Sequence, residues 1–218
     1  MEARNRILLI KGAKAFGIVL TERSVEAFDL YLRELLKWNR KMNLTAIRSE
    51  KEIVVKHFID SLAVVPHLSG ATALLDIGSG AGFPGLPIKM VMPDLEVVLL
   101  ESVQKKVHFQ SHVIRILRLQ GVKAIHGRAQ DEEVLGYWEG RFDAVVARAF
   151  SDLKTLLRLG NPFLKSKGLL IALKGPAFKR ELTSLSSPEV FPLRLDRRVD
   201  YTLPFTTLHR TLLLFRRD

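Results

Sequence analysis

The segment Asp76-Ile77-Gly78-Ser79-Gly80-Ala81-Gly82-Phe83-Pro84-Gly85 decides the fold of this chain. It directly follows the short apolar run at residues 73–77, and four glycines fall within residues 78–85. Glycine lets a backbone turn tightly and approach a ligand closely, because no side chain is in the way. The segment therefore predicts a ligand-binding loop at the end of a buried strand.

On both sides of the loop, short apolar runs alternate with helix-length segments. They predict buried strands at residues 73–77, 97–100, 122–125, 144–147 and 169–173. A helix to about residue 186 follows Pro176, and two further strands near 190–195 and 207–215 are expected to close the sheet edge as a hairpin. Strands joined by helices form right-handed crossovers, and their ligands lie at the carboxyl ends of the strands. We expect an α/β, Rossmann-like, mostly parallel seven-stranded sheet over residues 71–218.

The first 70 residues have a different pattern. A helix capped by Thr21 is predicted from apolar side chains that recur at three- and four-residue steps, namely Val25, Phe28, Leu32, Leu35 and Leu36. The period is lost over residues 38–45, and a second helical run extends from about 49 to 65. Glycines and lysines interrupt the apolar stretch 7–20, which favours a docking helix over a signal peptide. Residues 1–70 are therefore expected to form a helical cap, integrated with the domain at 71–218.

Composition excludes several classes of protein. The chain has 218 residues, of which 47% are hydrophobic, so it can build a core. It has no cysteine, which excludes a disulfide scaffold, a thiolate zinc site, an iron–sulfur cluster and a cysteine nucleophile. No stretch reaches the roughly 18 uncharged apolar residues that a membrane span needs. We expect a cytoplasmic protein without a membrane partner.

Positive charge gathers at the two ends of the chain. With 34 Lys and Arg against 23 Asp and Glu, the net charge is +11, and it divides into +4 up to residue 70, 0 for 71–150 and +7 beyond. A neutral middle between basic flanks suits a small molecule bound in the middle and a nucleic acid at the flanks. Lys and Arg that only maintain solubility are the alternative explanation.

The charge of the loop bears on the cofactor. Gly80, Gly82 and Gly85 satisfy the dinucleotide spacing G-x-G-x-x-G, so a nicotinamide-dependent oxidoreductase remains an alternative. However, Asp76 precedes the first glycine, and its carboxylate opposes a pyrophosphate. S-adenosylmethionine carries a sulfonium and an ammonium group, and the electrostatics therefore favour it.

Two further strand ends carry candidate cofactor contacts. Glu101 ends the second strand, where its carboxylate can accept hydrogen bonds from both ribose hydroxyls of either cofactor. At the end of the third strand, the backbone of Ala129 and the amide of Gln130 can contact an adenine edge.

The chain resembles a known family, the ribosomal small-subunit methyltransferase G family, also called glucose-inhibited division protein B. The matching pieces occur in the family's order: Trp38-Asn39, Asn43-Leu44-Thr45, His57, Asp60-Ser61, residues 76–87, Arg148-Ala149-Phe150, Ala172-Leu173-Lys174-Gly175 and the strand of Arg210. The resemblance implies a class I S-adenosylmethionine-dependent methyltransferase fold. It also implies methyl transfer to N7 of a guanosine in 16S ribosomal RNA.

The same resemblance implies where the cofactor binds. The expected contacts are Gly78, Phe83, Glu101, Ser102, Val103, Ala129, Gln130 and Arg148.

Guanine N7 has an exposed lone pair, so its methylation needs no general base, and the site is expected to work by positioning and electrostatics. Arg148, at the end of the fourth strand, is assigned to cofactor or base placement, and Lys174 to RNA. Lys105 and Arg115 lie on a basic helix face that can bind RNA phosphates, although a solvated face is the alternative.

The remaining polar residues suggest no other chemistry. The histidines of that helix lack carboxylate partners in the sequence, so no metal is expected. His57 and Asp60 are expected to order the cap over the pocket. The partner is predicted to be 16S rRNA or the small ribosomal subunit, bound by a monomer. A methyltransferase for another RNA or for a small molecule remains the alternative.

Overall fold

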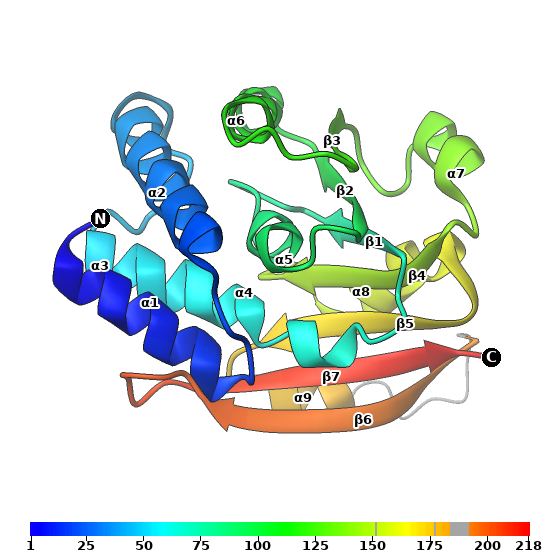
Figure 1. Cartoon of the computed structure of the whole chain (residues 1–218). Coiled ribbons are helices and arrows are strands. Elements are labelled where there is room, and N and C mark those ends of the chain that lie inside the picture. The colour runs from blue at the N-terminus through cyan, green and yellow to red at the C-terminus, as the bar shows by residue number, and fades with distance from the viewer. Residues whose placement is uncertain (151, 177, 184–191) are drawn as a thin grey trace.

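The computed structural model describes residues 1–150, 152–176, 178–183 and 192–218, and it is built on one seven-stranded sheet (Figure 1). The strands are β1 Ala73–Ile77, β2 Glu96–Glu101, β3 Val122–His126, β4 Phe142–Arg148, β5 Leu164–Lys174, β6 Leu193–Thr202 and β7 His209–Arg217. Their order is β3-β2-β1-β4-β5-β7-β6; β7 runs antiparallel to both β5 and β6, and the other neighbouring strands are parallel. The predicted mostly parallel seven-stranded sheet is confirmed.

The five predicted central strands are present and mostly one or more residues longer than expected. The expected C-terminal hairpin is also present, since β6 and β7 pair in antiparallel register from Leu193 opposite Arg217 to Thr202 opposite His209. The predicted helix after Pro176 is α9, Phe178–Thr183. The rest of that helix prediction, at 184–186, and the expected strand start at 190 and 191 lie outside the described residues.

Helices cover both faces of the sheet (Figure 1). They are α5 Gly85–Val91, α6 Gln104–Ile116, α7 Glu132–Trp138, α8 Leu153–Gly160 and, after it, the 3₁₀ turn Asn161–Phe163. Alternate side chains of β1 point to opposite faces, so Leu74 joins the cluster under α5 and α6 whereas Leu75 joins the one under α7 and α8. The crossovers place the carboxyl ends of β1 to β5, and the loops that follow them, at the same end of the strands.

The expected cap is helical. It consists of α1 Ala3–Ala15, α2 Glu22–Met42, α3 Glu50–Ile53, a π-helical segment Val54–Ile59, α4 Asp60–Leu62 and a 3₁₀ turn Val65–His67. The Thr21 side chain caps α2 as predicted, because its oxygen accepts a hydrogen bond from Ser24 N at 3.1 Å. The cap and the sheet share a single hydrophobic cluster in which Phe28 and Phe58 of the cap join Leu99 and Leu214 of the sheet. The domain boundary at residue 70 stays a prediction.

The first long cap helix extends beyond the last of its regularly spaced apolar residues. The period is lost over residues 38–45, whereas α2 continues to Met42. The polar side chain that breaks the pattern, Asn39, is buried, and it accepts a hydrogen bond from Thr45 N and donates one to Thr45 O, both at 2.9 Å. Asn43 then ends the helix in the left-handed conformation, with φ of 49°. In the sequence, a buried helical Asn whose amide holds the following turn has the same polarity as an Asn in a loop, so polarity cannot distinguish the two.

None of the described helices combines the length and the apolar composition that a bilayer crossing requires.

Candidate cofactor and substrate site

The glycine loop after β1 requires its glycines. Gly78, Gly80 and Gly82 adopt φ of 69°, 60° and 99°, in the left-handed region that side chains disfavour. A Cβ added to Gly85 would lie 2.3 Å from a methyl carbon of Leu99, so this residue lets the start of α5 approach β2 closely. The loop is a tight backbone turn supported from below by the sheet.

Asp76 lies beneath this loop. Its side chain is 0% exposed, and its Oδ2 accepts a hydrogen bond from Gly85 N at 2.8 Å. Oδ1 is buried and makes no hydrogen bond within the described structure. Burial raises the pKa of Asp76 to about 7, against the lowering effect of the Gly85 bond and of Arg148. This carboxylate was expected at the mouth of the loop, whereas in the structure it is a buried support with one unpaired oxygen.

Glu101 ends β2 beside the loop. Its Oε2 accepts from Gly80 N at 2.8 Å and its Oε1 from Val103 N at 2.9 Å. Each carboxylate oxygen has two lone pairs, so both can accept one more hydrogen bond. A Cβ added to Gly80 would have its nearest heavy-atom neighbour at 4.0 Å, the Gly78 oxygen. Open space and two acceptor atoms therefore lie together here, and they fit the hydroxyls of a nucleoside cofactor.

The other predicted cofactor residues lie at the neighbouring strand ends. Ser102 and Val103 are exposed directly after β2, and Gln130 is exposed after β3, whereas Ala129 is buried. The two strand ends are joined by a hydrogen bond from Gly127 N to Glu101 O at 3.1 Å. The structure thus brings these residues to one edge, and their contact with the cofactor remains a prediction.

Gln110 was missed by the sequence analysis. It is fully buried on α6, and its amide nitrogen donates to Ser79 Oγ at 2.8 Å and to Gly80 O at 2.7 Å. It therefore ties the loop to the helix that follows β2. A polar residue on the apolar face of a predicted helix was the available signal.

Arg148, at the end of β4, lies under the cap. Its Nη2 donates to His57 Nδ1 at 2.9 Å and its Nη1 donates to Lys56 O at 3.0 Å. Because a guanidinium only donates, His57 must accept at Nδ1 and carry its proton on Nε2, which lies 2.9 Å from Thr45 Oγ1. Burial, followed by the charge of Arg148, lowers the pKa of His57 to about 3. The imidazole is therefore neutral and serves to orient Arg148.

Phe83 is packed against this pair. Its ring lies 4.5 Å from the His57 ring in a stacked arrangement, and the Arg148 guanidinium lies 5.1 Å from its centre. The Phe83 side chain is only 4% exposed. It supports Arg148 and the loop, and the cofactor contact that the family resemblance implies for it stays a prediction.

Asp60 is the second anchor of the cap. Its Oδ1 accepts from the Tyr201 hydroxyl at 2.9 Å, and its carboxylate lies 3.7 Å from Arg148 and 3.6 Å from Arg210. Burial raises the pKa of Asp60, and the two arginines oppose that rise. His57 and Asp60 thus link the cap to β4 and to the β6–β7 hairpin, in agreement with their expected ordering role.

A cavity of about 360 Å³ opens beside Arg148. It is lined by Ile47, Lys56, His57, Asp60, Arg148, Ala149, Leu173, Lys174, Gly175 and Arg210. Lys174 was predicted to contact RNA, and its side chain is only 10% exposed and pairs with Glu181 at 2.7 Å. It therefore belongs to the wall of this cavity and not to an open surface.

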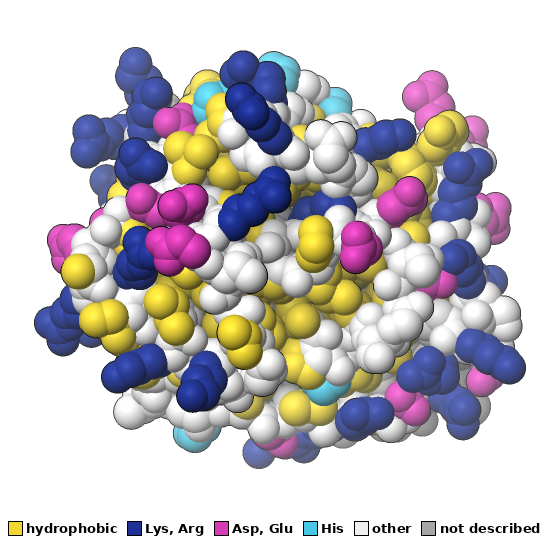
Figure 2. Space-filling view, in the orientation of Figure 1, with side chains coloured by type: hydrophobic (Ala, Val, Ile, Leu, Met, Phe, Trp, Pro, Cys, Tyr) yellow, Lys and Arg dark blue, Asp and Glu magenta, His cyan; other side chains and the backbone are white. Residues whose placement is uncertain are grey.

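The basic helix face predicted on α6 is only partly exposed. Lys105 and Arg115 are exposed, but His112 lies between α6 and α2, where it pairs with Glu34 at 2.7 Å and packs against Trp38 at 5.0 Å between rings. Lys and Arg side chains gather over α2 and α6 along the top of the molecule (Figure 2). The exposed part of the face thus extends onto the cap.

Comparison with known proteins identifies the family. The family model described as rRNA small subunit methyltransferase G matches residues 24–193. A protein named ribosomal RNA small subunit methyltransferase G from Geobacter metallireducens is 41% identical over 100% of this chain and 98% of its own length. The protein of the same name from Acetivibrio thermocellus is 38% identical over 99% of this chain and 90% of its own length.

Solved structures support the fold. The YcgJ protein from Bacillus subtilis aligns with a TM-score of 0.54 at 15% identity, over 74% of this chain and 99% of its own. Geranyl diphosphate methyltransferase in complex with S-adenosylmethionine aligns with a TM-score of 0.55 at 14% identity, over 72% of this chain and 84% of its own. These likenesses show the class I methyltransferase fold, and the full-length relatives displace the oxidoreductase alternative. The chain belongs to the rRNA small subunit methyltransferase G family, a family of S-adenosylmethionine-dependent methyltransferases.

Proposed function

We propose that the protein transfers the methyl group of S-adenosylmethionine to N7 of a guanosine in 16S ribosomal RNA. One observation carries the choice of reaction: the titratable side chains around the Arg148 cavity are already engaged as positioning groups. His57 is neutral and has both ring nitrogens occupied, while Asp60 is held by Tyr201, Arg148 and Arg210. A nucleophile with a free lone pair suits such a site, because its attack on a methyl group needs no general base.

The proposed mechanism is therefore one of placement. The bound cofactor supplies an electrophilic methyl group. Glu101 and the loop at Gly78 and Gly80 would hold its nucleoside part, and the unpaired oxygen of buried Asp76 would favour its positive charge through the local potential. Arg148, fixed by His57, would place the cofactor or the guanine so that N7 faces the methyl group. The base would enter the 360 Å³ cavity.

Charge supports RNA as the substrate over a small molecule. The ends of the chain hold all of the +11 excess, and Lys105 and Arg115 are exposed on α6. Figure 2 shows Lys and Arg side chains gathered over this helix. RNA is a polyanion and gains binding affinity from such a basic surface, whereas a small neutral substrate does not. The proposal includes 16S rRNA or the small subunit as partner, a monomeric enzyme and a cytoplasmic location.

The test is transfer of labelled methyl from S-adenosylmethionine to small-subunit RNA or subunits that lack the modification. Nuclease digestion and mass spectrometry then identify the labelled nucleoside. We expect label in 7-methylguanosine with the wild type and little label with Glu101→Ala. Glu96→Ala, at the exposed start of the same strand, is the matched control and should label normally. Label in another nucleoside, or only in a small molecule, would contradict the proposal.

A further inference from the structure

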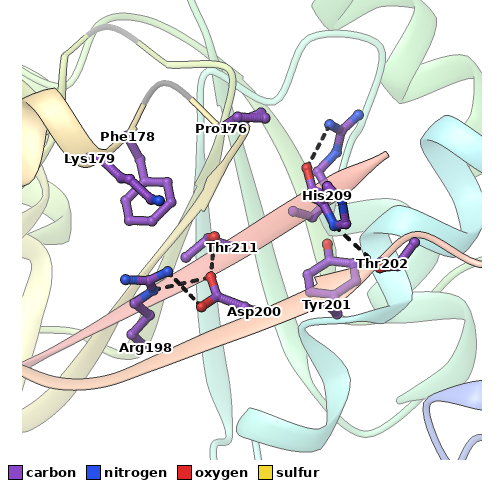
Figure 3. Close-up of a pocket in the computed structure, with 10 residues that line it drawn as sticks. Pro176, Phe178, Lys179, Arg198, Asp200, Tyr201, Thr202, His209 and Thr211 are labelled. Atoms are coloured by element: carbon purple, nitrogen blue, oxygen red, sulfur yellow. Dashed lines mark hydrogen bonds and ion pairs between the residues drawn. The ribbon is translucent and has the colours of Figure 1, made fainter. Parts of the chain in front are cut away.

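A second cavity of about 470 Å³ lies beside the Arg148 cavity, between α9 and the β6–β7 hairpin (Figure 3). Its lining comprises Pro176, Phe178, Lys179, Arg198, Asp200, Tyr201, Thr202, His209, Arg210 and Thr211. Its volume falls within the roughly 300–1,000 Å³ that small-ligand sites occupy. Nothing in the mechanism above uses it.

The two cavities meet at Arg210, which lines both. The chain itself passes from one to the other, because Gly175 lines the first cavity and Pro176 the second. A ligand that extends out of the first cavity past Arg210 therefore enters the second. A polymer whose units repeat at short intervals is the kind of ligand that can occupy both.

The second cavity has the charge of an anion site. Three cationic side chains and one carboxylate, Asp200, line it. The carboxylate is already neutralised, since Arg198 pairs with it at 2.7 Å and the Thr211 hydroxyl donates to it at 2.5 Å (Figure 3). Lys179 is exposed, and its charge adds to that of Arg198 in lowering the pKa of Asp200. It forms no ion pair with any described residue, so its ammonium can also bind a phosphate.

The cavity also has a flat stacking surface. The Arg198 guanidinium lies over the Phe178 ring, 4.8 Å from its centre. Phe178 is 3% exposed and fixes the inner face of the guanidinium, while the Arg198 side chain is 42% exposed. Guanidinium planes held in this way stack on the splayed bases of single-stranded RNA. Thr202 and His209, 3.4 Å apart at the exposed strand ends, add polar groups within reach of a sugar hydroxyl.

We propose that this second cavity binds the RNA nucleotide next to the methylated guanosine, with its phosphate at Lys179 and its base on the Arg198 guanidinium. The inference rests on the proposed function, because it assumes that the neighbouring nucleotide occupies the Arg148 cavity. It makes the β6–β7 hairpin a substrate-binding element and not only the edge of the sheet.

The experiment measures methyl transfer to unmodified small-subunit RNA by full-length variants. Lys179→Ala should raise the KM for RNA about fivefold, as expected for a partly exposed ion pair, and should lower the slope of log affinity against log salt by about 1. Arg198→Ala should raise KM about tenfold through lost stacking. Arg198→Lys keeps the charge but loses the plane, so it should raise KM without changing the salt slope.

Arg194→Ala is the matched control. Arg194 lies on the same strand, its side chain is 72% exposed, and it lines neither cavity. It should leave KM unchanged, and the affinity for S-adenosylmethionine should be the same in all variants. Because Lys179 is exposed, its substitution should not alter the melting temperature, which is measured in parallel.

Equal KM values for Lys179→Ala, Arg198→Ala and Arg194→Ala, with normal transfer by the wild type, would overturn the inference alone. Absence of transfer to RNA by the wild type would overturn the proposed function, and the inference would fall with it. The wild-type measurement therefore separates the two failures.

Discussion

Removal of the Asp60 carboxylate is expected to be the most destabilising single change at the site. Its side chain is 5% exposed, and it is the anionic partner of both Arg148 and Arg210 as well as the acceptor of the Tyr201 hydroxyl. In Asp60→Ala, the Arg148 guanidinium stays buried at 16% exposure without its counterion, and the Tyr201 hydroxyl loses its acceptor.

The magnitude follows from the two arginines. Loss of one partner of a buried ion pair costs about 3–5 kcal/mol, because the remaining charge is left uncompensated. Arg210 is 24% exposed and can regain water, so we expect the lower part of this range, about 3 kcal/mol. For a chain of 218 residues, each kcal/mol corresponds to about 2–4 °C, which gives a fall in melting temperature of about 6–12 °C.

Urea unfolding followed by circular dichroism measures this loss. The matched control is Asp196→Ala, which removes a surface pair with Arg216 at 3.2 Å and should cost less than about 1 kcal/mol. Asp60→Asn keeps the shape and an acceptor for Tyr201 but removes the charge, so it should fall between the two. Equal stabilities for Asp60→Ala and Asp196→Ala would refute the reasoning that this buried carboxylate holds the cap to the sheet.

Three further predictions concern the loop and the cap. Asp76 has a pKa of about 7 in the fold, raised by burial from its ordinary value of 3.8, so the wild type should lose stability as pH rises from 4 to 7, and the gain from Asp76→Asn, measured by urea unfolding at each pH, should grow over that range. Gly78→Ala forces a side chain onto φ of 69° and to 2.9 Å from the Phe150 ring, and should weaken S-adenosylmethionine binding at least tenfold by calorimetry, whereas Gly136→Ala, with no neighbour within 4 Å, should not. Because the pKa of His57 is lowered, the wild type should lose stability as pH falls from 6.5 towards 3. In His57→Gln, the free energy of unfolding should fall less steeply over that pH range.

The loop and the strand ends could be predicted because their signals are local. Glycines after an apolar run predict a turn after a strand, and the next apolar run, which ends in Glu101, predicts a second strand end beside it. Such local signals could not show how deeply a side chain is buried. The Asp76 carboxylate, expected at the mouth of the loop, is fully buried, since the tight turn folds α5 back over β1 and brings Gly85 N to 2.8 Å from it.

The network around Arg148 could not be predicted, because its partners are far apart along the chain. His57 and Arg148 are separated by 91 positions, and Asp60 and Tyr201 by 141. Periodicity indicates which face of a segment is buried but not which residue lies opposite. Lys174 illustrates the same point: as a residue after a strand it has the pattern of a surface lysine, and its pairing with Glu181 depends on how α9 packs.

The cap residues with no assigned chemistry acquire a physical role from these contacts. Asn39 holds Thr45, Thr45 lies against His57, and His57 fixes Arg148, so a turn of the cap determines the orientation of a guanidinium at the end of β4. A reaction that uses no general base depends on the geometry of its approach, and small displacements are costly. It follows that substitutions at Asn39 or Thr45 should impair methyl transfer through the role proposed for Arg148, while leaving the cofactor contact proposed for Glu101 intact.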